Sequence, residues 1–316
     1  MFGFFRVAWG SVKIWDKNTY GVLGMALEIE RFPQNPIIHS GLDDSLGENI
    51  NGPSLIRVPP CVANPLGKYY LYFAHHRGDF IRLAYADDLS GPWHIYRAGV
   101  LHVDQTPCQD HIASPDVHVD PTRHQIVMYY HGVYQGNQVT FVAVSDDGLT
   151  FRTVGGPLGP SYFRVFEHGD FYYAIAKDPG VEGGGVILRS EDGRTAFQKG
   201  PHIIPRMRHA ALLKRGNTLN VFFSRGGDCP ERILVRRIEL SNNWTQWSAV
   251  DEREVLAPET EYEGVHLPLL PSRFGPAPGP VRQVRDPACF SEDGAVYLLY
   301  SCAGESGIAI ARILGL

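Results

Sequence analysis

A unit of four short strands recurs five times along this chain, and this repeat constrains the fold more than any other feature. Each copy has a strand, a tight Gly/Asp hairpin, a strand rich in Tyr and Phe, a Gly-rich loop and further strand sequence near an acidic turn. The copies run over 52–93, 114–151, 162–197, 208–244 and 285–313. Such units, spaced by roughly 45–75 residues, are typical of propeller blades, whereas a β-sandwich needs no aligned copies. We therefore predict an all-β, five-bladed β-propeller.

The repeat also predicts how the chain is divided. We expect a single propeller domain over 1–316, with blades at approximately 52–101, 111–157, 160–201, 206–256 and 283–316. The fifth copy lacks an outermost strand, so residues 1–50 are expected to supply it and close the ring. Residues 257–282 form a Pro-rich insertion without a strand pattern, and we expect it to fold over one face as a lid or a substrate wall.

The charge and hydropathy patterns exclude several classes of partner. The chain has 29 basic and 34 acidic residues, a formal net charge of −5 and no basic run. It therefore lacks the footprint of a nucleic-acid-binding protein and a polybasic membrane patch. No run reaches the ~18 apolar residues of a membrane span, and the absence of a clean signal peptide favours a cytoplasmic location. We expect a small or polymeric solute as the partner, and no motif indicates an oligomeric state.

Propeller topology brings the starts of the first strands and the ends of the second strands to one end of the central channel. Alignment of the copies on their hairpins gives a ring of first-strand positions: Gly52, Ser114, Tyr162, His209 and Asp286. The second strands and the loops after them add His75, His76, Arg77, His131, Lys177, Arg225, Glu231 and Glu305. Polar groups that converge from several blades indicate a site for a polar ligand, although a propeller channel is commonly wet whatever its function.

Several of these residues are suited to bind a carboxylate or a ring of hydroxyls. Arginine forms forked hydrogen bonds to a carboxylate or to neighbouring hydroxyls, although each arginine is otherwise a structural partner of a nearby Asp. We predict substrate-binding roles for His75, His76, Arg77, Ser114, Tyr134, Tyr162, Arg164, Arg208, Arg225 and Arg285.

Three segments resemble five-bladed propeller glycoside hydrolases, with glycoside hydrolase family 43 as the nearest group. They are the Tyr-Tyr-Leu-Tyr unit of 52–73, SPDVHVD at 114–120 and RDPACFSEDGAVYLLYS at 285–301. The resemblance implies a carbohydrate substrate. Family 43 has a base carboxylate before the Pro of blade one, a pKa-modulating carboxylate in blade two and an acid Glu in blade three. Here these positions read Gly52, Ser114, and either Tyr162 or 158–160, and only blade five keeps Asp-Pro, at Asp286. The family's catalytic trio therefore cannot be transferred.

We predict a glycoside hydrolase that cleaves a bond in an oligo- or polysaccharide. Hydrolysis of a glycoside uses two carboxyl groups, and a neutral imidazole can also serve as general acid or base near pH 7. The catalytic candidates are Asp286, Asp116, Glu305, Glu263, His209 and His131.

Two other functions stay open at this point. One is a polysaccharide lyase or other sugar-modifying enzyme that uses histidines, with or without a divalent metal. The other is a noncatalytic carbohydrate-binding propeller. We expect no cofactor for the hydrolase, with a His-bound divalent metal or a structural Ca²⁺ as the alternative.

Overall fold

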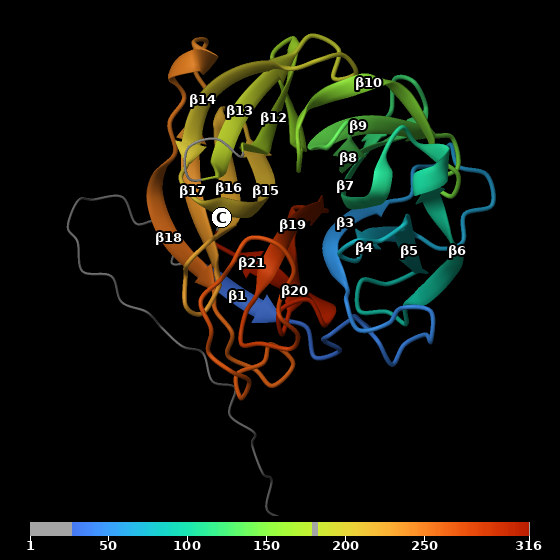
Figure 1. Ribbon diagram of the computed structural model, residues 1–316, viewed down its shortest axis with the longest axis vertical. Helices are drawn as coiled ribbons and strands as arrows, with labels where there is room; N and C mark the ends of the chain where they lie inside the picture. The colour runs from blue at the N-terminus through green and yellow to red at the C-terminus, as the bar shows by residue number, and fades with distance from the viewer. Residues whose placement is uncertain (1–26, 179–182, 316) are drawn as a thin grey trace, which may run out of the picture.

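The computed structural model describes residues 27–178 and 183–315, and its strands form five antiparallel sheets around a central axis (Figure 1). The prediction of a five-bladed β-propeller is confirmed. The first blade comprises β3 (Asn51–Arg57), β4 (Tyr69–Ala74), β5 (Phe80–Ala86) and β6 (His94–His102). The second comprises β7 (Gln109–Asp120), β8 (Gln125–Tyr134), β9 (Asn137–Ser145) and β10 (Arg152–Pro160).

The remaining blades follow the same order from the axis outward. The third comprises β11 (Arg164–His168), β12 (Phe171–Asp178), β13 (Gly184–Ser190) and β14 (Gln198–Ile204). The fourth comprises β15 (Met207–Arg215), β16 (Thr218–Arg225), β17 (Ile233–Glu239) and β18 (Val250–Leu256). The fifth comprises β19 (Arg285–Glu292), β20 (Ala295–Cys302) and β21 (Gly307–Leu314). Two 3₁₀ turns, η1 (Val103–Gln105) and η2 (Trp244–Gln246), lie in connections of the described chain.

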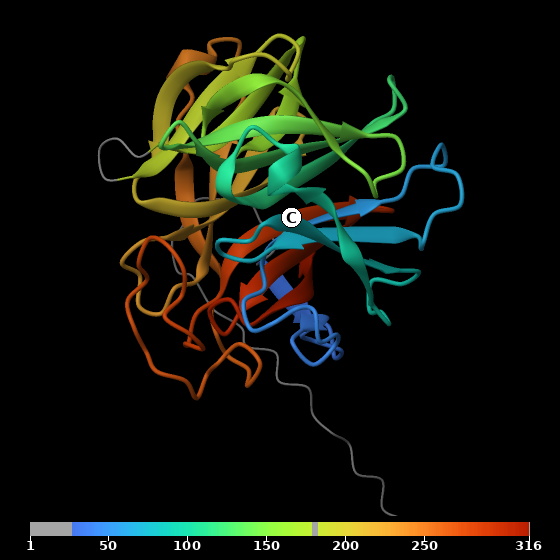
Figure 2. The same ribbon diagram turned by 45° about the vertical axis from the view of Figure 1, so that its right-hand side comes forward.

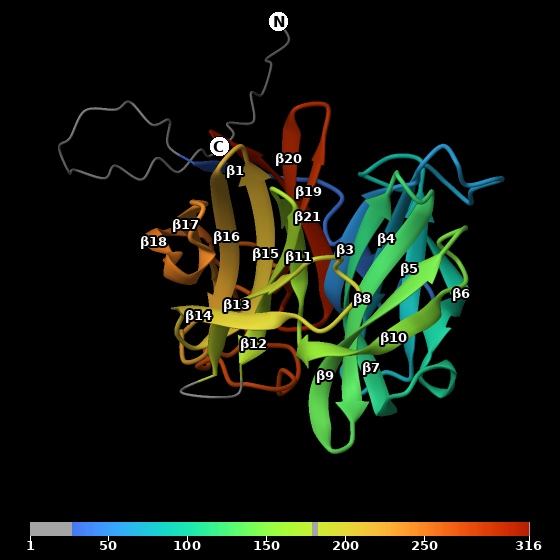
Figure 3. The same ribbon diagram turned by 90° about the horizontal axis from the view of Figure 1, so that it is seen from above.

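The outermost strand of the fifth blade comes from the N-terminal part of the chain. Strand β1 (Glu28–Arg31) pairs antiparallel with β21, with Glu28 opposite Leu314, and β2 (Ile38–His39) pairs farther along β21 (Figure 3). The fifth blade is thus built from both ends of the described chain. Residues 1–26 of the segment expected to close the ring lie outside the described residues.

The blades are held together by side chains that alternate along each strand. Strand β4 reads YYLYFA and is buried throughout. Tyr70 and Tyr72 pack with residues of the second blade, whereas Leu71 and Phe73 pack with residues of the fifth. Successive side chains of a strand point to opposite faces, so a sheet between two neighbours must be apolar on both. Each of the five hydrophobic clusters in the described residues fills one interface between adjacent blades.

Four first strands, β3, β7, β15 and β19, carry one extra residue near the start, and in the third blade the equivalent residue stands just before β11. In β19 the pairing passes from Arg285–Ser301 to Ala288–Leu299. Between these pairs Asp286 and Pro287 lie opposite the single residue Tyr300, and Asp286 has a φ of 49°. The corresponding positions in the first three blades are Gly52, Ser114 and Tyr162, with φ of 63°, 52° and 68°. Bulges of this kind re-aim side chains, and strained backbone of this kind clusters at functional sites. We call this end of the channel the bulge end and the opposite end the hairpin end.

The fourth blade corrects the alignment made from the sequence. In β15 Met207 pairs with Arg225 and His209 with Ser224, followed by Ala210 with Phe223. The residue equivalent in register to Asp286 is therefore Arg208, and His209 follows it. The hairpin alignment was wrong by one residue here, because the position of a bulge depends on strand pairing and leaves no mark in the sequence.

One position in each of the first three blades forms a hydrogen bond to the next blade. The backbone N–H of Val117 donates to the Ser54 hydroxyl at 2.9 Å, and that of Val165 donates to Asp116 Oδ2 at 2.7 Å. The Arg164 guanidinium then donates to the carbonyl of Ala210 at 3.0 Å. These bonds join consecutive blades just inside the bulges and fix the ring there.

Candidate active site

A buried carboxylate–histidine pair lies at the bulge end between the fourth and fifth blades. His209 Nδ1 is 3.0 Å from Asp286 Oδ1, and Asp286 Oδ2 accepts a hydrogen bond from the Ser301 hydroxyl at 3.1 Å. Burial lowers the pKa of His209 to about 4, and so the imidazole is neutral near pH 7. Burial alone would raise the pKa of Asp286, but His209 and Arg285 hold it below its usual value. The carboxylate thus accepts Nδ1–H, which leaves Nε2 as an acceptor without a hydrogen-bond partner in the described chain.

A row of aromatic rings continues from this pair toward the second blade. The ring of Tyr162 lies 5.1 Å from that of His209, His131 lies 6.3 Å from Tyr162, and His111 lies 6.4 Å from His131. The Tyr162 hydroxyl is buried and has no hydrogen-bond partner among the described residues, as is also true of His131 Nδ1. Burial raises the pKa of Tyr162 well above its usual value and lowers that of His131 well below its own. The row therefore presents a protonated phenol beside neutral imidazoles.

Two cations lie beside this row. The ammonium group of Lys177, at the end of β12, has no hydrogen-bond or ion-pair partner among the described residues, and burial together with Arg208 lowers its pKa to about 8. Arg208 is 1% exposed, and its Nη1 also lacks a partner. Its Nη2 donates to the carbonyl of Gly275 at 2.9 Å, while its Nε lies 3.3 Å from Glu231 Oε1. Both cations therefore keep unused N–H groups at the bulge end.

A second arginine organises the wall of this end. Arg285 Nη2 lies 2.7 Å from Glu231 Oε2, and Nη1 donates to Glu305 Oε1 at 2.9 Å. All three side chains are almost completely buried. Glu305 Oε2 in turn lies 2.8 Å from His76 Nδ1. Burial would raise the pKa of Glu305, but its bond to His76 and the charge of Arg285 lower it to about 2. Both carboxylates are thus fully engaged as ion-pair partners.

The Pro-rich insertion packs against the same wall (Figure 2, in orange). The Ser272 hydroxyl donates to Glu231 Oε2 at 2.7 Å, and the backbone N–H of Ala277 donates to Glu305 Oε1 at 3.3 Å. Phe274 stays 48% exposed, with Lys177 Nζ 5.5 Å from its ring centroid. The insertion thus contributes one exposed aromatic ring next to the two cations.

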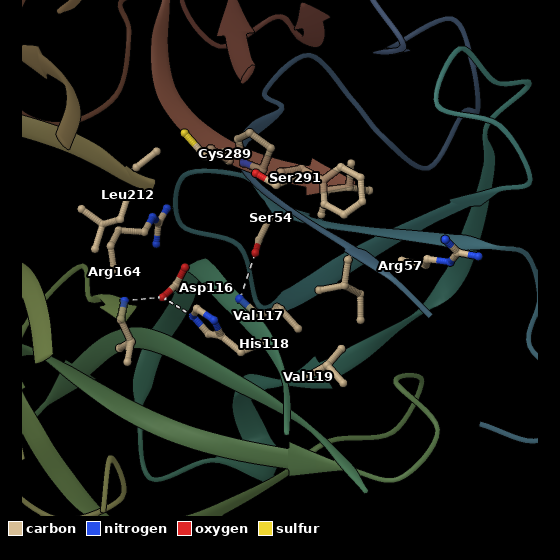
Figure 4. Close-up of a pocket in the computed structure, with 17 residues that line it drawn as sticks. Ser54, Arg57, Asp116, Val117, His118, Val119, Arg164, Leu212, Cys289 and Ser291 are labelled. Carbon is tan, nitrogen blue, oxygen red and sulfur yellow. Dashed lines mark hydrogen bonds and ion pairs between the residues drawn. The ribbon is translucent and has the colours of Figure 1, made fainter. Parts of the chain in front are cut away.

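A cavity of about 410 Å³ occupies the channel below the bulges and extends toward the hairpin end (Figure 4). Ser54, Asp116 and Arg164 line its inner part, and Arg57 and Ser291 lie farther along its wall. Asp116 Oδ2 accepts from the backbone of Val165, and His118 Nε2 lies 2.8 Å from the same oxygen. The Arg164 guanidinium lies 4.3 Å from the centroid of the Tyr162 ring. Arg164 therefore lies between the cavity and the residues of the bulge end.

The other carboxylate candidate, Glu263, lies away from these groups. Its side chain is fully buried and accepts hydrogen bonds from Arg31 at 2.7 Å, from the Tyr300 hydroxyl at 2.7 Å and from the backbone of Glu259 at 2.8 Å. These contacts anchor the insertion to β1 and β20. We therefore leave Glu263 outside the proposed site.

The remaining candidates are distributed around the rim. His75 Nδ1 has no hydrogen-bond partner in residues 27–178 and 183–315, while Arg77 is exposed in the turn after β4. The carbonyl of Ser114 accepts from Arg164 at 3.3 Å. Tyr134 packs its ring against Phe141 at the tip of the second blade. Arg225 donates to Glu252 Oε1 at 2.5 Å, toward the outer strand of its blade.

A sequence relative and several solved structures are similar to this chain. A scan against models of protein families finds no match. The "Uncharacterized protein R118" of Acanthamoeba polyphaga mimivirus is 34% identical over 330 residues, which cover 91% of this chain and 90% of the viral protein. The chain belongs to the family of this mimivirus protein.

Several solved structures are similar to this chain in fold but distant from it in sequence. An α-L-arabinofuranosidase from Lactobacillus brevis is 14% identical, with a TM-score of 0.60 over 88% of this chain and 92% of that one. A glycosyl hydrolase from Bacteroides ovatus is 12% identical, with a TM-score of 0.64 over 90% and 92%. A GH43_1 enzyme from Xanthomonas citri, complexed with xylose, is 13% identical, with a TM-score of 0.58 over 84% and 87%. The fold is that of the family-43 glycoside hydrolases.

Sequence reasoning assigned no role to three residues that the structure places at the bulge end: Lys177, Glu231 and Phe274. Lys177 and Glu231 were located at the correct end of the channel, and Lys177 is the only charged group in the apolar run of β12 before its final Asp. Phe274 stands in an insertion without strand pattern, so its distance from Lys177 leaves no sequence signal. The groups of at least three His, Cys, Asp or Glu side chains that a metal site needs do not occur in the described residues. Nor does the described chain contain a helix with the length and apolar character needed to cross a bilayer.

The neutral state of His209 predicts how stability depends on pH. Its pKa is lowered from 6.5 to about 4 in the folded chain, so below pH 6.5 the unfolded chain binds the additional proton. The free energy of unfolding should therefore fall as the pH is lowered from 6.5 to 4. His209→Gln should reduce this fall by on the order of 1–3 kcal/mol. Urea unfolding followed by tryptophan fluorescence at several pH values measures the effect, and equal slopes in both proteins would contradict it.

Proposed function

We propose that this chain is a glycoside hydrolase-like enzyme that cleaves a glycosidic bond in an oligo- or polysaccharide bound at the bulge end of the channel. The observation that carries the proposal is the buried Asp286–His209 pair beside the Tyr162 hydroxyl, which has no hydrogen-bond partner in the part of the chain that the structure describes. Cleavage of an acetal needs a proton acceptor and a proton donor close together. The fold shared with family-43 hydrolases supports the same class of reaction.

In the proposed reaction His209 Nε2 accepts a proton from a water molecule, whose oxygen attacks the anomeric carbon. The bond from that carbon to the glycosidic oxygen breaks, and the leaving oxygen takes the Tyr162 hydroxyl proton. Asp286 keeps its charge, orients the imidazole and stabilises the imidazolium that forms. The phenolate and the imidazolium then regain their starting states by proton exchange with water.

The test is a screen of the purified chain against aryl glycosides and natural oligosaccharides, with and without a chelator, read by mass and by ultraviolet absorbance. We expect a product that has gained water and that forms equally with chelator. Saccharide binding without any product would contradict the proposal and support a noncatalytic sugar-binding propeller.

The assignment of Tyr162 as proton donor makes a separate prediction. Tyr162→Phe removes the hydroxyl proton and keeps the ring, so kcat should fall by about 10²–10⁴-fold while KM changes little. Tyr85→Phe in the first blade is the matched control and should leave kcat within a factor of two or so. An undiminished kcat for Tyr162→Phe would remove Tyr162 from the reaction.

A β-elimination is the second candidate reaction. The small number of carboxylates at the bulge positions favours it, because hydrolysis of a glycoside commonly uses two. Of the five bulge positions only Asp286 is acidic, and its Oδ1 already binds His209. In an elimination His209 takes a proton from the carbon next to a uronic carboxylate, the bond to the leaving oxygen breaks, and a carbon–carbon double bond forms. The leaving oxygen again takes the Tyr162 proton. The unsaturated product absorbs in the ultraviolet and contains no added water, so the same screen separates the two reactions.

A further inference from the structure

We infer that the bulge end recognises an acidic saccharide, with its anionic oxygens between Lys177 and Arg208 and its sugar ring against Phe274. This inference rests on the proposed function and names the class of substrate for that site.

The first support is the kind of polar atom that stays unpartnered. In the described chain the Tyr162 hydroxyl, Arg208 Nη1 and Arg164 Nη2 are all buried and without a hydrogen-bond partner. Their side chains are 2%, 1% and 4% exposed. All three are donors, and a buried donor without an acceptor costs about 1–3 kcal/mol. A ligand rich in acceptor oxygens would satisfy them together.

The second support is the distribution of charge. Glu231 is the carboxylate nearest to Arg208, but its two oxygens already accept from Ser224 and Ser272, and Oε2 also binds Arg285. The Arg208 Nε–Glu231 contact of 3.3 Å lacks hydrogen-bond geometry. Lys177 has no carboxylate within ion-pair distance in the described residues. An anionic group is therefore the ligand that these two cations favour.

The third support is the ring of Phe274. The ring stays half exposed beside Lys177. It also lies close to the backbone of Gly226, and this contact needs a glycine because a Cβ at position 226 would lie 3.0 Å from the ring. The next residue, Gly275, accepts the hydrogen bond from Arg208. The aromatic surface and the cations are therefore fixed to each other. An apolar ring face with convergent polar groups at its edge is a common arrangement in ligand sites.

The test compares binding of a uronate oligosaccharide, its carboxyl-reduced neutral counterpart and a sulfated analogue to the full chain by calorimetry. We expect at least one acidic ligand to bind about tenfold or more tightly than the neutral one. Lys177→Met should reduce that affinity by about 10–100-fold and leave the neutral ligand unaffected, while Lys214→Met, an exposed lysine at the far end of β15, should change neither. Equal affinity for all three ligands, or an unaffected Lys177→Met, overturns the inference.

The contribution of Phe274 has its own readout. Phe274→Ala should weaken binding of the acidic and the neutral sugar by a similar factor of roughly 5–10, because stacking does not depend on charge. Leu269→Ala, an exposed side chain of the same insertion, is the control and should leave both affinities unchanged. If the Phe274→Ala variant binds both sugars with the affinity of the native chain, the Phe274 ring is not part of the site.

The two proposals can fail separately. Tight binding of the acidic ligand without cleavage contradicts the proposed enzyme and leaves the acidic-sugar site intact. Cleavage of neutral saccharides with no preference for acidic ones supports the proposed enzyme and contradicts the acidic-sugar site.

Discussion

Asp286→Asn is expected to lower kcat for bond cleavage by about 10³–10⁴-fold. The amide is the same size as the carboxylate, so the packing around Ser301 and His209 should persist. Its NH₂ group, however, can donate to Nδ1, which favours the tautomer whose Nε2 carries the proton and cannot accept another. The loss of charge also removes the stabilisation of the imidazolium. Rates measured on the substrate found by the screen, at saturating concentration, give the effect.

The comparison that makes this test specific is Asp116→Asn. Asp116 also binds a histidine, His118, but it lines the channel cavity and accepts a backbone bond from the third blade. We expect a much smaller loss of kcat for Asp116→Asn than for Asp286→Asn. The reverse order would move the chemistry from the bulge end into the cavity. Thermal unfolding of both variants shows whether the fold has been preserved.

Arg285→Met is expected to have the largest effect on stability, a loss of about 3–5 kcal/mol. The substitution leaves Glu231 and Glu305 buried without their shared cation. A buried charge without a partner costs far more than a broken pair at the surface, and Tm should fall by roughly 10 °C. Scanning calorimetry measures the change.

Two further variants distinguish the stability lost with the ion pair from the stability lost with the packing of the long side chain. Arg237 also bridges two carboxylates, those of Glu239 and Asp251, but all three are exposed, so Arg237→Met should cost less than about 1 kcal/mol. The triple variant Arg285→Met, Glu231→Gln, Glu305→Gln should recover most of the lost stability, because neither buried carboxylate is then left without the cation of Arg285. A triple variant as unstable as Arg285→Met would mean that packing, not charge, determines the loss.

The fold could be predicted from the sequence because each blade interface requires it. A strand such as β4 can be apolar at every position only where both of its faces are covered, and largely apolar second strands recur between turn residues in the other blades. The arrangement of the site is different. Asp286 and His209 were both candidates, but their contact depends on a bulge that moves the fourth blade by one residue.

Long-range polar contacts explain the other differences between the site expected from the sequence and the contacts in the structure. Glu263 is a plausible acid by sequence, since it stands in an insertion near other candidates. In the structure its partner is Arg31, 232 positions away, and no local sequence pattern predicts a pair so far apart. The identity of the free donors at the bulge end is equally nonlocal, because whether Arg208 or Arg285 takes the carboxylates is decided by packing among three blades and the insertion.

The pairing of β1 with β21 has a consequence for how the chain is made. During synthesis β1 emerges before the other strands, whereas its partner β21 emerges after the strands of the first four blades and after β19 and β20. Until then the ring is an open arc, with β1 as an unpaired strand and the faces of two blades uncovered. An open edge of this kind invites pairing with another chain. The ribosome-bound intermediate is therefore the stage at which this protein depends most on being shielded from its neighbours.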